Sequence, residues 1–257
     1  FLKDKMLDNN DDGGSGDRDH ASRETRKSKV NDSNDSESKV DPMIRDGVTK
    51  TVLAGYSVGH FANDLCASMW FIYLSYYLLY VVKLNPSISG LCLLSGQIAD
   101  GITTPIVGYF SDKLSCKCGQ RNTWYYFGSI LVAPAFLCIF LGFDFFESDA
   151  SRNAWYLIWP AIFNIGWAAV QISHLAIVNQ LSYSQRKRDQ MVVNRNGFTY
   201  AANIFVLSLA LALFATVSSQ KTQFTVLSLV CVALGAVTTV FYVISIRESY
   251  LSKIALQ

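Results

Sequence analysis

Charged side chains are scarce over most of this chain. The 257 residues include 22 Lys and Arg and 20 Asp and Glu, yet only 20 of these 42 lie among the 207 residues that follow residue 50. A soluble domain has about a quarter of its residues charged, so this stretch lacks the polar groups that a water-facing surface requires. The composition therefore argues against a soluble globular enzyme. The net charge of +2 is scattered over loops without forming a basic face, which argues against a nucleic-acid partner.

Cysteine patterns typical of a disulfide scaffold or a metal site are also missing. Four of the six cysteines sit inside apolar runs, where cysteine usually behaves as a small hydrophobe. Cys116 and Cys118 form a Cys-Lys-Cys in a basic loop, but the second pair that a zinc site needs is absent. No nucleophile motif precedes a predicted helix either. We therefore expect no metal, no cofactor and no enzymatic activity.

The charge that is present is concentrated at the start of the chain. Residues 1–50 contain 10 basic and 12 acidic residues, and residues 8–41 are rich in Asp, Ser, Asn and Gly with almost no apolar side chains. Such a segment cannot bury enough apolar surface to offset its ordering entropy. It also lacks the apolar run that follows the charges of a signal peptide. We therefore predict a disordered, charged tail over residues 1–50.

Long apolar runs follow this tail. A membrane-spanning helix needs about 20 mostly apolar residues, and no run alternates with a period of two as the strands of a barrel would. We therefore predict an all-α integral membrane protein. The first run is longer than a bilayer requires, which predicts tilt or a kink. The segment 51–257 contains six predicted spans, at about 52–82, 88–110, 124–143, 154–179, 197–218 and 224–246.

Basic residues distinguish the two sides of the membrane. The loops at 111–123 and 180–196 hold most of the basic residues, whereas each alternating loop holds one. Because positively charged loops stay in the cytosol, both ends of the chain and the two basic loops are predicted to be cytosolic. The basic residues of these two loops are Lys113, Lys117, Arg121, Arg186, Lys187, Arg188 and Arg195.

Two acidic residues lie inside predicted spans, whereas the other acids after residue 50 fall in loops. They are Asp64 in the first span and Asp100 in the second. A carboxylate at the bilayer centre costs several kcal/mol and is kept mainly where it faces a cavity or a partner. A structural carboxylate paired with a helix N-terminus or an Arg is the alternative. The position of both acids favours a functional role.

Further polar residues recur at steps of three and four, so each set shares one face of its helix. Four such stripes on four spans predict a common water-accessible cavity, which is typical of a transport pathway. For a single Asn or Thr, a hydrogen bond between helices is the alternative. The stripes are His60, Asn63 and Asp64 in the first span, Gln97, Asp100 and Thr104 in the second, Asn164, Trp167, Gln171 and His174 in the fourth, and Asn196, Thr199 and Asn203 after Arg195 in the fifth.

The end of the second span carries a known type of motif. The run Gly108-Tyr-Phe-Ser-Asp112-Lys113, followed by Gly119-Gln-Arg121, resembles the loop 2–3 signature of the major facilitator superfamily, G-x-x-x-D-[RK]-x-G-x-[RK]. The departure is that five residues separate Lys113 from Gly119 where the family has one. In that family the Asp and its basic partners tether the cytosolic ends of helices across the two halves of the transporter.

Three longer stretches resemble one branch of the same superfamily, the glycoside-pentoside-hexuronide:cation symporters. These stretches are residues 56–71, 96–109 and 166–175, and they follow one another in the same order as in that branch. Members of the superfamily have twelve spans in two six-span halves, with substrate bound between the halves. The resemblance therefore implies an amino-terminal half that is completed by a missing carboxy-terminal six-span half.

The resemblance also implies roles for individual residues. In that branch the residue matching Asp64 recognises substrate, and the residue matching Asp100 sits at the cation site. The second acid of the family's cation site corresponds to Thr104, so a sodium site would be one carboxylate short and H+ is expected as the coupling cation ahead of Na+. A fifth-helix Arg that reaches substrate in the family corresponds loosely to Arg195.

We therefore expect a secondary active transporter, a proton-coupled symporter of a small polar solute. The resemblance implies cysteine import into lysosomes or melanosomes. A sugar:cation symporter at the plasma membrane and a non-transporting membrane scaffold or receptor are the alternatives. The proton is expected at Asp100 beside Thr104, and a histidine could also titrate in an acidic organelle. The residues expected to bind solute are His60, Asn63, Asp64, Trp167, Gln171, His174 and Arg195.

Overall fold

The computed structural model describes residues 48–113, 119–182 and 184–246. These residues are helical apart from short connections, and no strand occurs among them, which confirms the all-α class. The tail predicted over residues 1–50 lies outside the described residues except for its last three positions. The Cys-Lys-Cys at 116–118 also lies outside them.

The first predicted span is not one continuous α-helix. It consists of three segments, α2 (Lys50–Val58), α3 (Phe61–Tyr76) and the π-helical turn η1 (Tyr77–Val81). At the end of α2 the N–H of Gly59 bonds to the Tyr56 carbonyl at 3.2 Å, and α3 begins after His60. The kink expected from the length of this span is therefore a break at Gly59–His60.

Five longer helices follow, and each contains most or all of one further predicted span. They are α4 (Pro86–Lys113), α5 (Gln120–Phe140), α6 (Asp149–Leu181), α7 (Gln185–Thr216) and α8 (Gln220–Ser245). The largest difference is at α7, which begins well before the predicted residue 197. Its first turns are polar and basic, so hydropathy does not detect them. At the start of α6, Ser148 and Ser151 form a capping box.

Five candidate membrane spans meet the requirements of length and apolar composition. They are the first span and α5, α6, α7 and α8. Helix α4 has 28 residues, which is long enough for a bilayer. Its Gln97, Asp100 and Thr104 lower its mean hydropathy, however, and it is not among the five. The second predicted span is therefore the most polar of the six.

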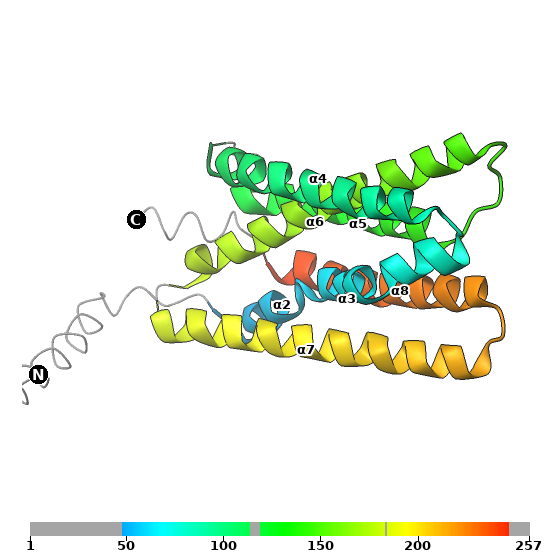
Figure 1. Ribbon diagram of the computed structural model, residues 1–257. Helices are drawn as coiled ribbons and strands as arrows, with labels where there is room; N and C mark the ends of the chain where they lie inside the picture. Colours follow the sequence, from blue (N-terminus) through cyan, green and yellow to red (C-terminus); the bar gives the residue numbers. More distant parts are fainter. Residues whose placement is uncertain (1–47, 114–118, 183, 247–257) are drawn as a thin grey trace, which may run out of the picture. The chain divides into compact units, whose positions relative to one another are not determined.

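Helices α6 and α3 each pack mainly against two other helices. Helix α6 packs along both α4 and α5, while α3 packs against α7 and α8 (Figure 1). The contact between α5 and α6 is close, because a Cβ on Gly128 would come within 2.5 Å of the Gly166 carbonyl oxygen. Small residues allow this kind of close approach between membrane helices.

Successive spans run in opposite directions, so α2 begins and α8 ends at the same end of the helices (Figure 1). The last turn of α4, the first turn of α5 and the first turns of α7 lie at this end too, and they carry most of the described basic residues of the predicted loops. The arrangement is therefore consistent with the predicted distribution of charge, in which one end of the helices is rich in basic residues and the other end has few.

Candidate functional site

Two side chains from other helices bond to carbonyl groups at the break in the first span. His174 on α6 donates from Nε2 to the Tyr56 carbonyl at 2.8 Å. The Tyr125 hydroxyl on α5 donates to the Gly59 carbonyl at 2.6 Å. An unsatisfied backbone group costs several kcal/mol in the hydrocarbon region. These two hydrogen bonds therefore stabilise an interruption of the helix inside the span.

The space around the break is filled by aromatic rings. A Cβ on Gly59 would lie 2.3 Å from Cδ2 of Tyr242 and 2.9 Å from Nε2 of His174. The His174 ring stacks on Tyr56 with centroids 4.3 Å apart, and the Tyr242 hydroxyl donates to Asn122 Oδ1 at 3.1 Å. Only glycine fits at position 59 without displacing one of these rings.

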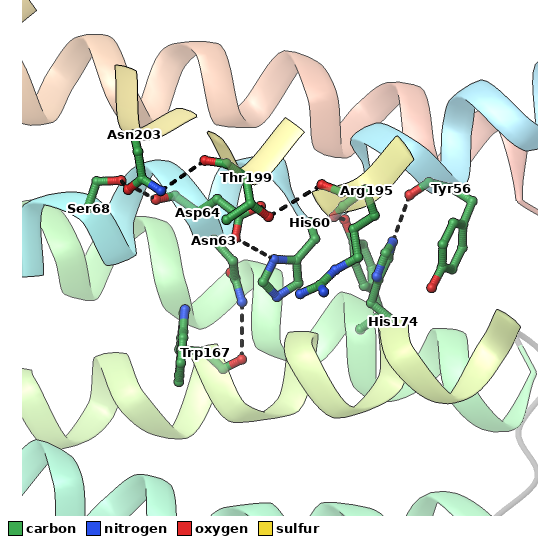
Figure 2. A network of polar contacts seen from close by, with 12 residues as sticks. Tyr56, His60, Asn63, Asp64, Ser68, Trp167, His174, Arg195, Thr199 and Asn203 are labelled. Atoms are coloured by element: carbon green, nitrogen blue, oxygen red, sulfur yellow. Dashed lines mark hydrogen bonds and ion pairs between the residues drawn. The ribbon is translucent and has the colours of Figure 1, made fainter. Parts of the chain in front are cut away.

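Asp64 lies in the first turn of α3, directly after the break, and is 7% exposed. Its Oδ1 accepts a hydrogen bond from His60 Nδ1 at 2.9 Å, and its Oδ2 accepts one from the Thr199 hydroxyl on α7 at 3.1 Å (Figure 2). The N-terminus of a helix carries a partial positive charge that favours a carboxylate. Two donors and a helix end thus offset the cost of burying this acid. Discontinuous membrane helices place such ends at solute sites in transporters.

The partners of the two buried histidines determine which nitrogen carries hydrogen. A carboxylate can only accept, so His60 Nδ1 carries the hydrogen shared with Asp64. A carbonyl can only accept, so His174 Nε2 carries the hydrogen shared with Tyr56. The remaining nitrogens, His60 Nε2 and His174 Nδ1, are buried and have no partner among the described residues. The two ring centroids are 5.6 Å apart.

A further set of hydrogen bonds joins α3 to α7 beyond Asp64. Ser68 lies one turn along α3 and donates to Asn203 Oδ1 at 2.6 Å. Asn203 in turn donates from Nδ2 to the Thr199 carbonyl at 3.0 Å. The carboxylate is therefore held in a network that connects both helices (Figure 2). The contact of Thr199 and Asn203 with α3 agrees with the interhelical hydrogen bonds that sequence reasoning kept as an alternative for such residues.

Helix α6 and the start of α7 complete the site. Asn63 donates from Nδ2 to the Trp167 carbonyl at 3.1 Å. Figure 2 shows the Arg195 side chain extending towards the rings of His60 and His174. Several polar atoms of the residues on these helix faces are buried and unpartnered within the described part of the chain. They are Tyr56 Oη, His60 Nε2, Trp167 Nε1, Gln171 Oε1, His174 Nδ1 and Arg195 Nε.

The acid of the second span lies apart from this network. Asp100 is half-buried on α4, and its one hydrogen bond among the described residues comes from the Thr104 hydroxyl at 3.3 Å. Gln97 on the same face is exposed, and Asn164 bonds to the Pro160 carbonyl of its own helix at 2.8 Å. The structure therefore brings together three of the four predicted stripes.

Within the described ranges no group of three His, Cys, Asp or Glu side chains is placed to hold a metal ion.

The predicted loop 2–3 signature links α4 to α5. Arg121 forms an ion pair with Asp112 and donates to the Ser111 hydroxyl at 2.7 Å. Lys113 instead lies over the ring of Tyr109, with Nζ 4.2 Å from the centroid. Gly108 is half-buried on α4. Gly119 precedes α5 with a φ of 106°, a conformation that favours glycine.

Sequence reasoning missed the aromatic residues around the break. Tyr56, Tyr125 and Tyr242 are almost fully buried, and all three rings lie against His174. Tyrosine is common in membrane helices, so its presence alone gave no signal. The steps of four from Tyr56 to His60 to Asp64 place all three on one helix face, and this spacing could have identified the first of them.

Comparisons with known proteins agree with this architecture. The profile of the family described as MFS/sugar transport protein matches residues 55–253. Major facilitator superfamily domain-containing protein 12 of Equus caballus is 36% identical over 215 residues, which cover 75% of this chain and 45% of that protein. The uncharacterized symporter sll1374 of Synechocystis is 26% identical over 67% of this chain and 32% of its own length. The sodium-dependent lysophosphatidylcholine symporter 1 of Mus musculus is 27% identical over a region that covers 54% of this chain and 27% of its own length. The chain thus spans about half the length of the first of these relatives.

Proposed function

This chain belongs to the MFS/sugar transport protein family, and on that basis we propose that it forms one half of a secondary active transporter, a symporter that moves a small polar solute together with a proton. The observation that carries the proposal is the set of buried polar atoms near the break in the first span that have no partner among the described residues. An unsatisfied buried donor or acceptor costs about 1–3 kcal/mol. A polar solute that enters this cluster would offset that cost for several atoms at once.

The charges of the site favour a solute that carries both signs. Asp64 supplies a carboxylate and Arg195 a guanidinium within one cluster. Arg pairs well with carboxylate groups, and a carboxylate attracts an ammonium group. An amino acid such as cysteine offers both groups, which supports the cysteine import implied by the sequence resemblance. A sugar is the second candidate, because the Trp167 indole N–H is unpartnered and could donate to a hydroxyl.

Asp100 is our candidate for the proton that drives accumulation. It offers one carboxylate with the Thr104 hydroxyl beside it, which is sufficient for a proton and offers few oxygen ligands to a sodium ion. Two relatives are named as symporters, one of them sodium-dependent. These names support a coupled cation, so Na+ is the alternative that the experiment must compare with H+.

The charge of the loops supports a cytosolic location for both ends of the chain. The first turns of α5 and α7 carry Arg121 and the basic residues of 186–188, and they lie at the end of the helices where α2 begins and α8 ends (Figure 1). We propose a lysosomal or melanosomal membrane for the complete protein, with the plasma membrane as the alternative.

The test uses the complete transporter in sealed vesicles, with labelled cysteine or labelled sugars and a pH gradient imposed in either direction. We expect cysteine flux that depends on the pH gradient and continues when Na+ is replaced. Arg195→Gln should reduce this flux at least tenfold, while Arg186→Gln, an exposed arginine at the same end, serves as the matched control. Flux of sugar alone would favour the second candidate. Absence of any solute flux would support a scaffold or receptor instead.

A further inference from the structure

We propose that the His60–Asp64 pair is a proton-binding site, and that a carboxylate of the solute promotes proton uptake at His60 by binding Arg195. This inference rests on the proposed function and deepens it, because it names the chemical class of solute and the group that links solute binding to a proton. It places this solute-linked proton in the first span, in addition to the proton at Asp100 on α4 that we propose drives accumulation.

One nitrogen of His60 is available to a proton. Nδ1 already carries the hydrogen that it donates to Asp64 at 2.9 Å, and Nε2 is buried without a partner among the described residues. A proton from water would add to the lone pair of Nε2 and convert the neutral ring to an imidazolium. That cation would lie beside the carboxylate of Asp64, which the Thr199 hydroxyl holds in place. A nearby opposite charge favours the charged form of a titratable group.

Arg195 acts against this proton. Figure 2 shows its side chain extending towards His60 and His174, and its Nε is buried with no partner in the part of the chain that the structure describes. A guanidinium remains charged in proteins, and like charges repel more strongly in a protein interior than in water. While Arg195 lacks an anionic partner, it therefore disfavours a second positive charge on His60.

The other titratable groups around the two histidine rings do not contribute a charge of either sign. His174 donates from Nε2 to a carbonyl, and histidine, tyrosine and cysteine side chains are ordinarily mostly neutral at pH 7. The proton balance at His60 is therefore set by Asp64 and Arg195. These groups are Tyr56 of α2, Tyr125 of α5, His174 of α6 and Tyr242 of α8.

A solute carboxylate changes this balance. When it pairs with Arg195 it cancels much of the guanidinium charge, and Asp64 then stabilises the protonated His60. Solute binding thus raises the proton affinity of the pair. Linkage requires the reverse as well, so a bound proton tightens solute binding by the same factor. A solute without a carboxylate leaves Arg195 unpaired and has no such effect.

The experiment measures the equilibrium binding of cysteine and of cysteamine to the complete transporter. Cysteamine has the same thiol and amine groups as cysteine but no carboxylate. Binding is followed between pH 5 and 8, the range in which histidine titrates, and a pH-sensitive dye records proton uptake. We expect cysteine affinity to fall by about 5- to 150-fold across this range, the usual size of coupling between two sites. Cysteine binding should take up a proton, and cysteamine binding should not.

Two variants and a control locate the effect. His60→Gln should still bind cysteine but lose both the pH dependence and the proton uptake. Arg195→Gln should make cysteine and cysteamine behave alike. Asp189→Asn should keep the pH dependence of cysteine binding, because Asp189 is exposed near the start of α7 and is not part of the network. An unchanged pH dependence in His60→Gln, or equal proton uptake with cysteamine in the wild type, overturns the inference. Binding of sugar alone overturns it while sparing the transporter assignment, and binding of neither solute overturns both.

Discussion

The imidazole Nε2 of His174 donates to the carbonyl oxygen of Tyr56 over 2.8 Å, and the two rings stack with centroids 4.3 Å apart. One side chain thereby satisfies the backbone at the helix break and fills the space beside it. Sequence reasoning placed His174 among the solute ligands. In the structure its Nε2 is used at the break, which gives His174 a positioning role there, and its Nδ1 has no partner among the described residues.

Tyr125→Phe should destabilise the protein, because the Gly59 carbonyl loses the hydroxyl that bonds to it at 2.6 Å. A buried carbonyl left without a donor costs about 1–3 kcal/mol, and thermal unfolding of the complete protein measures the loss. Tyr200→Phe is the control, since Tyr200 is 70% exposed and its variant should change stability by less than about 0.5 kcal/mol. Equal stability of both variants would contradict the role of Tyr125.

Gly59→Ala should lower both stability and solute affinity. The added methyl group would lie 2.3 Å from the Tyr242 ring and 2.9 Å from His174 Nε2, so a ring must move. Gly101→Ala on α4 is the matched control, because no heavy atom lies within 4 Å of a Cβ there. That variant should be neutral or stabilising, since alanine is the better helix former by about 1 kcal/mol. Thermal unfolding and equilibrium binding distinguish the two variants.

Thr199→Val should weaken solute binding about tenfold, because Asp64 loses one of its two side-chain donors and its carboxylate becomes free to reorient. A hydrogen bond to a charged group contributes about 1.5–3 kcal/mol. Thr216→Val, at an exposed position near the end of the same helix, tests the general effect of the substitution. Unchanged affinity in Thr199→Val would show that Asp64 does not contact the solute.

Asp100→Asn should abolish solute accumulation driven by a pH gradient and leave solute binding intact. Asparagine keeps the size of the side chain and its hydrogen bond with Thr104 but cannot bind and release a proton. Counterflow of labelled solute without a gradient reports binding and exchange, and Asp189→Asn at an exposed position near the start of α7 is the control. Normal accumulation by Asp100→Asn would assign the driving proton elsewhere.

Much of the helical architecture follows from hydropathy and loop charge. Apolar runs long enough to cross a bilayer mark the helices, and the cost of burying Asp64 within one of them identified the site. Helical periodicity also placed His60, Asn63 and Asp64 on one face. These inferences need only local sequence, which explains why they could be made without the structure.

The neighbours of each polar face could not be predicted in this way. Periodicity shows that Asp100 and Thr104 share a face, but it does not show that this face lies outside the Asp64 network. Glycine is frequent in membrane helices, so Gly59 alone does not indicate a break. That break depends on Tyr125 and His174, which lie far along the chain and donate to its carbonyl groups.

The low hydropathy of α4 has a consequence for the synthesis of the protein. The translocon releases helices into lipid according to their apolar character, and α4 contributes Gln97, Asp100 and Thr104 to the bilayer. Its main packing partner is α6, which leaves the ribosome after α5. Stable insertion of α4 is therefore expected to await α6, so a ribosome stalled before residue 149 should yield a nascent chain in which α4 has not settled in the membrane.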